Sequence, residues 1–359
     1  MKKKTVAWIV GVPAVLLVVA AAGAWAMFGT FVTAARSIRS LEDGLYGLVY
    51  SGDYGFDEFL AQGGADSDSA LAGYLASYLS HGFYKPESNT QTDSFGCSAV
   101  CVTDGRGGVY FGRNYDWEKC RAIIVHTRPE SGFESVSTCC LDFLGFGKDY
   151  RPDGTMSERF MTLAAIYVPL DGMNEKGLMI ADLMAGDKEE THQKTDKPDL
   201  TTTTAIRLLL DRAADVDEAI DLLKQYDMNS SIDAAHHFAI ADAGGKSVVV
   251  EYVNGEMLVT ETKIVANHYL GDCEKKGVGS EDSHARFNKL EAWTGDADEI
   301  GVRKRLEAVA QNGSDGDKTI WSIVYSPGEM RADFYFMEQY DRGYRLTLHD
   351  GNGFISLEP

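Results

Sequence analysis

The 359-residue sequence is short of proline, cysteine and positive charge. With eight prolines against 37 glycines, it has neither a collagen-like period nor a low-complexity block. Six cysteines are too few for a disulfide scaffold in a chain of this length. A net charge of −20 excludes nucleic acid as the default partner, because phosphate binding needs clustered Lys and Arg. The remaining composition, 44% hydrophobic and 25% charged, is that of a globular protein.

Positive charge is concentrated at the N-terminus. Residues 1–40 contain five basic and no acidic residues, which leaves 29 basic and 54 acidic residues in the rest. Residues 1–4, with three lysines, precede 31 uncharged residues at 5–35, more than the ~20 that cross a bilayer as a helix. Because positive residues favour the cytoplasmic side, we expect a cytoplasmic basic head at 1–4, a transmembrane signal-anchor at 5–35 and an extracytoplasmic body.

A cleaved signal peptide is the alternative to this anchor. Ala24-Trp25-Ala26 fits a small-x-small cleavage site, although the apolar stretch is longer than the core of about 7–15 residues usual in signal peptides. We favour a single-pass protein of the cell membrane. The body would be secreted if the signal is cleaved, and it is extracytoplasmic in both cases.

The rest of the chain divides into a pro-segment with a linker at 36–96 and a body at 97–359. The pro-segment contains a predicted helix at 69–84, and the polar run at 85–94 is predicted to be exposed. In the body we predict strands at 98–103, 109–113, 122–127, 161–168, 178–183, 237–241, 247–253, 256–260, 319–325, 333–338 and 344–348, and helices at 202–213, 216–226, 283–293 and 302–311. This mixture indicates an α+β fold, not a parallel α/β sheet.

One predicted hairpin brings reactive side chains together. Its turn at 104–108 would return Arg113 and Asp116 to the side of Cys97. An adjacent arginine favours the thiolate, the nucleophilic form of cysteine. From spacing alone, a buried cysteine near an ordinary surface Arg–Asp pair is the favoured interpretation.

Other potential ligands have simpler explanations. His236, His237 and His268 form no H-E-x-x-H motif, and a histidine at the start of an apolar strand is typical of a protein core. The cysteines have no C-x-x-C spacing, so most are interpreted as small buried residues. We therefore predict no metal and no cofactor.

The spacing of Cys97, Arg113 and Asp116, within Phe-Gly-Arg-Asn-x-Asp-Trp, resembles the choloylglycine hydrolase (linear amide C–N hydrolase) family. Relatives include bile salt hydrolases, penicillin V acylases and, more distantly, acid ceramidase. Four further segments resemble the family in the same order: Asp171 to Leu178, Ile240 to Tyr252, Val265 to His268 and Ser283 to Phe287. The resemblance covers about residues 96–350.

The resemblance implies an N-terminal nucleophile fold, an αββα sandwich with two antiparallel sheets between helix layers. It also implies that Cys97 becomes the first residue of the mature chain, so that its α-amine serves as general base for its own thiol. This role suits an α-amine, whose pKa is about 7.7–8. The resemblance therefore requires a cut between Gly96 and Cys97.

The resemblance also assigns roles to six residues. Cys97 would be nucleophile and base, Arg113 would support the thiolate, Asp116 would hold the α-amine, Asn174 and Asn267 would donate to the oxyanion, and Arg286 would hold the polar network. Each of the last three has a structural alternative: a turn residue for Asn174, a strand-end cap for Asn267 and a solvated helix charge for Arg286.

These expectations describe an amidohydrolase that cleaves linear, non-peptide amides through an acyl-enzyme. The run at 141–146 suggests a small-molecule substrate with an apolar acyl part. An acyltransferase using the same site and a catalytically inactive surface binding module are the alternatives.

Overall fold

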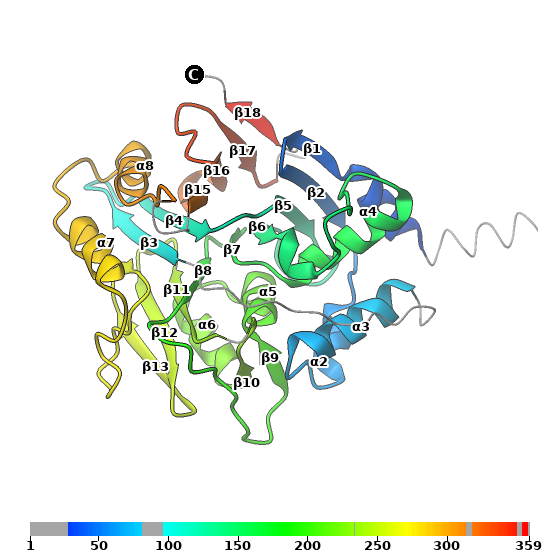
Figure 1. Ribbon diagram of the computed structural model, residues 1–359, viewed down its shortest axis with the longest axis horizontal. Helices are drawn as coiled ribbons and strands as arrows, with labels where there is room; N and C mark the ends of the chain where they lie inside the picture. Colours follow the sequence, from blue (N-terminus) through cyan, green and yellow to red (C-terminus); the bar gives the residue numbers. More distant parts are fainter. Residues whose placement is uncertain (1–27, 81–95, 233, 314–317, 350–353, 358–359) are drawn as a thin grey trace, which may run out of the picture.

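The structure is a computed structural model that describes residues 28–80, 96–232, 234–313, 318–349 and 354–357. Its largest element is a nine-stranded sheet (Figure 1). In spatial order its strands are β1 (Arg39–Glu42), β2 (Leu45–Ser51), β5 (Ala122–Arg128), β6 (Ser135–Cys140), β7 (Asp171–Asn174), β8 (Met179–Met184), β11 (His236–Ala241), β12 (Ser247–Val253) and β13 (Glu256–Glu261). Neighbours are antiparallel except β2 and β5, which run parallel.

A second, fully antiparallel sheet has seven strands. In spatial order these are β14 (Ile264–Val265), β3 (Gly96–Thr103), β4 (Val109–Trp117), β15 (Lys318–Ser326), β16 (Arg331–Phe336), β17 (Gly343–Thr347) and β18 (Ile355–Leu357). A short parallel pair joins β9 (Asp199–Thr201) to β10 (Asp227–Asn229).

Helices and 3₁₀ turns complete the chain. The helices are α2 (Phe56–Ala61), α3 (Asp68–Ser80), α4 (Met156–Thr162), α5 (Thr202–Arg212), α6 (Val216–Leu223), α7 (Glu281–Glu291) and α8 (Glu299–Ala308), and the 3₁₀ turns are η1 (Leu141–Leu144), η2 (Leu163–Tyr167) and η3 (Pro327–Glu329). Asp215 caps α6 by accepting from the backbone N–H of Glu218 at 2.9 Å. The Glu218 carboxylate accepts from the backbone N–H of Ala214 instead of that of Asp215, so the capping box is only half formed.

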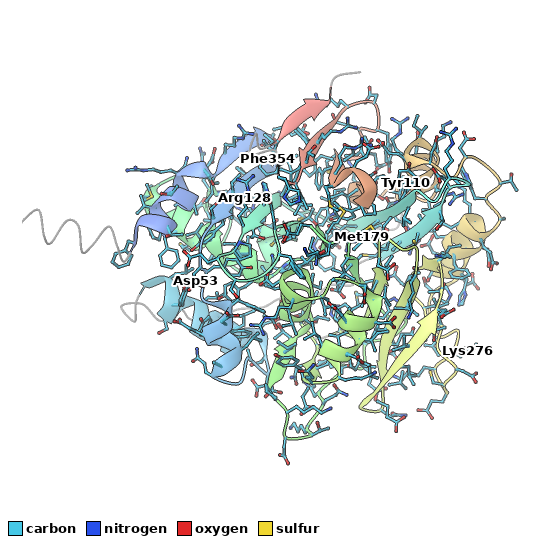
Figure 2. The ribbon with its side chains drawn as sticks, turned by 180° about the vertical axis from the view of Figure 1, so that it is seen from behind. Asp53, Tyr110, Arg128, Met179, Lys276 and Phe354 are labelled. Atoms are coloured by element: carbon cyan, nitrogen blue, oxygen red, sulfur yellow. A yellow bond between two sulfur atoms is a disulfide. The ribbon has the colours of Figure 1, made fainter. Side chains whose placement is uncertain are left out.

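The two sheets face each other across a buried apolar core. Along β8, Met179 and Ala181 belong to this inter-sheet core, whereas Ile180 packs on the side covered by α5 and α6. Met179 accordingly lies near the centre of the molecule (Figure 2). The helices α7 and α8 contact the seven-stranded sheet on its other face. The layers are therefore helix, sheet, sheet and helix.

The predicted strand at 161–168 is wrong, because this segment continues α4 into η2. Thr155 and Glu158 form a reciprocal capping box that starts the helix. All five residues of η2 are buried, and a fully apolar run shows no period that separates a strand from a helical turn.

The chain before β1 belongs in part to the folded body. Residues 28–37 are helical, and Phe31, Ala34 and Ala35 are buried in the protein. Some of the last eight residues of the predicted anchor at 5–35 therefore pack on the core, while the boundaries of the anchor stay a prediction. Residues 1–27 lie outside the described chain, and no helix within the described chain is long and apolar enough to cross a membrane.

Candidate active site

Cys97 lies near the start of β3, and the β3–β4 hairpin determines what faces it. The register pairs Cys97 with Tyr115 and Ala99 with Arg113. The turn at Asp104–Gly108 closes the hairpin, so the predicted pairing is confirmed. As a result, Arg113 Nη2 lies 3.3 Å from Cys97 Sγ.

Arg113 is completely buried, and neighbouring acceptors hold its guanidinium in place. Arg113 Nη1 donates to Asp171 at 2.8 Å, and Nη2 donates to the carbonyl of Asp182 at 2.9 Å. The Asp171 carboxylate also accepts from Trp321 Nε1 and from the hydroxyl of Tyr325. Because a buried charge is costly unless it is paired, this arrangement keeps a positive charge beside the thiol.

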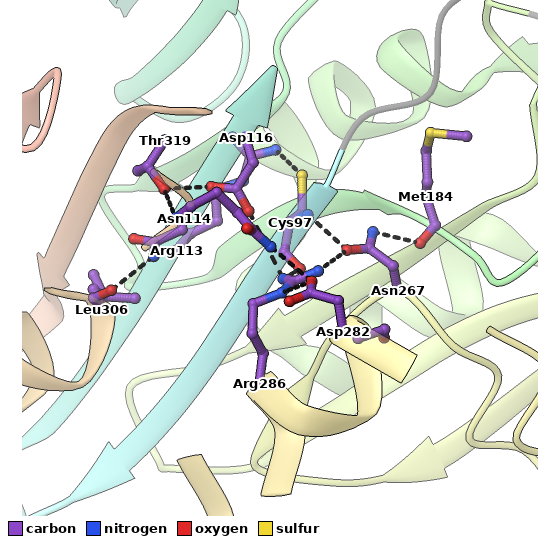
Figure 3. Close-up of polar contacts among 12 residues, drawn as sticks. Cys97, Arg113, Asn114, Asp116, Met184, Asn267, Asp282, Arg286, Leu306 and Thr319 are labelled. Atoms are coloured by element: carbon purple, nitrogen blue, oxygen red, sulfur yellow. Dashed lines mark hydrogen bonds and ion pairs between the residues drawn. The ribbon is translucent and has the colours of Figure 1, made fainter. Parts of the chain in front are cut away.

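Asn267 and Arg286 hold the backbone of Cys97 (Figure 3). The amide N–H of Cys97 donates to Asn267 Oδ1 at 2.7 Å, and Arg286 Nη2 donates to the same oxygen at 2.9 Å. Arg286 Nη1 donates to the carbonyl of Cys97 at 2.5 Å. One N–H of Asn267 donates to the carbonyl of Met184 at 2.9 Å, which leaves its second N–H for another acceptor.

The Asp116 carboxylate lies beside the Gly96–Cys97 bond. Its Oδ1 accepts from the hydroxyl of Thr319 at 2.6 Å. Its Oδ2 is buried, has no hydrogen-bond partner among the described residues and lies 3.7 Å from Arg286 Nη1. A Cβ built on Gly96 would lie 3.2 Å from this oxygen. Burial raises the pKa of Asp116.

The thiol of Cys97 is held in its protonated form. Burial raises its pKa to about 12, against the lowering effect of Arg113. Arg113 therefore favours the thiolate, as expected, but desolvation is the larger effect in the uncut chain. The two donors at Sγ are Arg113 Nη2 and the backbone N–H of Asp116 (Figure 3).

Most of the residues around Cys97 lie in a part of the chain that matches a protein family. Residues 97–268 match the family described as linear amide C–N hydrolases, choloylglycine hydrolase family. This region belongs to that family. The match begins at Cys97 itself, the residue around which the buried polar side chains gather.

Individual proteins are similar to parts of this chain. A penicillin V acylase from Pectobacterium atrosepticum is 30% identical over 103 residues, which cover 26% of this chain and 27% of the relative's length. A mutant conjugated bile acid hydrolase from Clostridium perfringens matches with a TM-score of 0.52 at 17% identity, over 73% of this chain and 97% of that one. A penicillin V acylase from Agrobacterium tumefaciens gives 0.46 at 16% identity, over 67% and 83%. The likeness to the bile acid hydrolase confirms the mixed α+β fold.

Of the six predicted site residues, Asn174 is the one whose side chain lies away from the Cys97 thiol. Its Nδ2 donates to the carbonyls of Leu210 and Ala213 at 3.1 and 2.7 Å, and its Oδ1 accepts from backbone N–H groups of the β7–β8 turn. These partners lie on the helix-covered side of the nine-stranded sheet, whereas Cys97 lies in the inter-sheet core. The expectation that Asn174 joins Asn267 at the oxyanion is therefore corrected: Asn174 is a turn residue.

The three histidines considered as possible ligands, His236, His237 and His268, are buried. His236 Nδ1 lies 2.9 Å from Asp182 Oδ1, and His237 Nδ1 lies 3.2 Å from Glu251 Oε1. Burial lowers the pKa of His268 to about 4, so its ring is neutral at pH 7.

Within the part of the chain that the structure describes, two clusters have the side-chain types of metal ligands. The first includes Cys120 and Cys140, which form a disulfide and so retain no thiolate for a metal. In the second, Glu134 lies near Glu175 and His349, but its carboxylate already accepts from His126, Arg128 and His349. We interpret this second cluster as an ion-pair anchor for the C-terminal segment.

Sequence reasoning missed two groups that complete the site. Asp171, which holds Arg113, begins a segment quoted for the resemblance but was given no role of its own. Thr319, which holds Asp116, lies more than 200 residues further along the chain. No local spacing connects Thr319 with Asp116, because their contact depends on the pairing of β15 with β4.

Proposed function

We propose that the chain is a cysteine N-terminal nucleophile amidohydrolase that cleaves linear, non-peptide amides with an apolar acyl part. The observation that carries the proposal is the set of contacts around Cys97: Arg113 at its thiol, Asn267 at its N–H and Arg286 at its carbonyl. All four residues belong to segments that resemble the choloylglycine hydrolase family.

The active form begins at Cys97, after hydrolysis of the Gly96–Cys97 bond. One water adds across this amide, giving the Gly96 carboxylate and the free α-amine of Cys97. The groups that hydrogen bond to Sγ in the uncut chain are donors, so neither can take the thiol proton. A free α-amine, with a pKa of about 7.7–8, supplies the missing base near neutral pH.

The free oxygen of Asp116 supports this cut. Asp116 Oδ2 lies against Gly96 and has no hydrogen-bond partner among the residues described, an unusual condition for a buried carboxylate. An ammonium group formed at Cys97 would provide the missing donor and a second positive charge beside that of Arg286. The cut would therefore give Asp116 Oδ2 a hydrogen-bond donor and, in the same step, create the α-amine that acts as base.

The chemical steps follow from these groups. The α-amine takes the thiol proton, and Cys97 Sγ attacks the substrate carbonyl carbon. The second N–H of Asn267 donates to the oxyanion. The leaving amine takes the proton from the ammonium as the C–N bond breaks, which leaves a thioester. Water, deprotonated by the α-amine, then attacks the thioester and releases the acid and the free thiol.

We place this reaction outside the cytoplasm. Three lysines before an apolar stretch favour this orientation. The Cys120–Cys140 disulfide also supports it, because disulfides persist in oxidising compartments. The partners are thus a small amide substrate and, through the N-terminus, a membrane.

Trapping the acyl-enzyme tests the proposal. The purified protein is incubated with phenoxyacetyl, cholyl and fatty-acyl amides, then digested and analysed by mass spectrometry. We expect an acyl group on a peptide that begins at Cys97, with acid and amine released in equal amounts. Transfer of the acyl group to added primary amines would indicate the acyltransferase. Absence of any acylation on Cys97 across the panel would contradict the proposed activity.

A further inference from the structure

We propose that residues 28–80, here called the N-terminal segment, remain bound to the catalytic chain after the cut and form a permanent second subunit. This inference rests on the proposed cut, which would leave the segment without a covalent link to Cys97 and the chain that follows. A pro-segment that only blocks a site can leave without disturbing the fold. The N-terminal segment is instead built into it.

The backbone of the segment completes the nine-stranded sheet. β2 runs parallel to β5 over seven residue pairs, from Leu45–Ala122 to Ser51–Arg128. Backbone hydrogen bonds from Ala122 to Gly44 and from Gly52 to Arg128 extend the pairing at both ends. Loss of the segment would turn β5, a strand with six buried residues, into an open edge.

An aromatic cluster fixes the segment to the helical turn η2. The ring of Tyr167 contacts Tyr54, Phe56, Phe59 and Tyr74 at centroid distances of 5.6 to 6.2 Å. The segment also contributes further buried apolar side chains to the same core: Leu48, Tyr50, Leu71 and Leu75. Departure of the segment would expose this continuous apolar surface to water.

Polar contacts fix the orientation of the segment. The hydroxyl of Tyr54 donates to Asp211 at 2.6 Å, and Asp211 forms a buried ion pair with Arg207 at 2.8 Å. The carboxylate of Asp68 accepts from the backbone N–H of Ile232 at 2.9 Å. Departure of the segment would remove the hydroxyl partner of a buried carboxylate, which is unfavourable.

Retention of the N-terminal segment would keep the mature enzyme at the membrane. The segment continues directly into the apolar N-terminus, so a bound segment ties the catalytic chain to the membrane after the cut. The cut therefore frees the α-amine of Cys97 but does not release the enzyme.

An engineered cut tests retention independently of the natural one. A protease recognition sequence replaces residues 85–92 in the full chain carrying Cys97→Ala, which cannot use its own nucleophile. After proteolysis, we expect both pieces to co-elute on size exclusion and to separate only in denaturant. Elution of the N-terminal piece by itself under native conditions would overturn the inference. If the wild-type chain never yields a fragment beginning at Cys97, the proposed cut fails, but the engineered cut still reports on retention.

Matched substitutions in β2 sharpen the test. Leu48 is fully buried in the shared core, whereas Ser51 on the same strand is exposed. We expect Leu48→Asp to release the cut segment at least tenfold more than Ser51→Asp. Should Leu48→Asp fail to fold, the chain 97–359 is produced alone and together with 28–96. The inference requires soluble protein only in the second case, and a soluble, equally stable 97–359 alone would contradict it.

Discussion

Two buried asparagines in family-like segments have different surroundings. Asn267 accepts from the backbone of Cys97 and from Arg286, so its amide is part of the cluster around the thiol. The side chain of Asn174 bonds to its own turn and to the end of α5. The comparison shows that a family-like motif identifies a segment near the site. Whether a side chain of that segment reaches Cys97 depends on the face of the sheet on which it lies.

The largest effect is expected at the nucleophile. Cys97→Ala removes the attacking sulfur, and loss of a nucleophile typically lowers turnover by on the order of 1,000-fold or more. Cys101→Ala is the matched control, since Cys101 is a buried cysteine on the same strand. Amide hydrolysis per mole of folded protein is the measurement. Equal loss in both variants would mean that the effect is structural.

Asn267→Ala should give the next largest effect. An oxyanion donor acts on charge that develops in the transition state, so its loss lowers kcat by about 100-fold or more, roughly 3 kcal/mol. The measurement is kcat and KM at matched concentrations of folded protein. A rise in KM with unchanged kcat would contradict the role.

Asn174→Ala should have the opposite signature. The substitution removes the side-chain hydrogen bonds of the β7–β8 turn and leaves buried carbonyls unsatisfied, at a cost of roughly 2–3 kcal/mol. Thermal unfolding should therefore shift down by about 5 °C, while kcat of the folded fraction stays near normal. A 100-fold loss of kcat without a change in melting temperature would return Asn174 to the site.

The smallest expected effect is on the pH dependence of stability. It concerns Glu134, which lies beside the turn between β7 and β8. Hydrogen bonds from His349, His126 and Arg128 hold its pKa at about 2, against the opposing effect of burial. Because the folded pKa lies below the ordinary value near 4.5, the carboxylate stabilises the fold above that value, and the stabilisation is lost as the pH falls towards 2. The stability difference between wild type and Glu134→Gln should therefore shrink between pH 4.5 and 2. A difference independent of pH in this window would exclude the charge as its source.

Local features of the sequence were sufficient to predict the core of the site. The register of a hairpin follows from its turn, so the positions of Cys97, Arg113 and Asp116 could be derived from a short stretch of sequence. Strands such as β11 and helices such as α6 were predictable from local periodicity. The role of Asn174 was not, since it depends on the distant carbonyls of α5.

Features set by long-range pairing could not be predicted. The parallel contact of β2 with β5 joins segments about 75 residues apart, and nothing in either strand specifies the other. Burial of the Cys97 thiol is a property of both sheets together, so the local spacing did not show that desolvation outweighs Arg113 in the uncut chain. Strand propensity carries little information about such contacts.

The central claim is that cutting before Cys97 creates the active enzyme. N-terminal sequencing of the C-terminally tagged protein, purified from its native membrane fraction and combined with an activity assay on the same sample, tests it most directly. We expect a chain that begins at Cys97 and activity that rises in proportion to the fraction cut. Full activity in protein whose Gly96–Cys97 bond is intact would contradict the account.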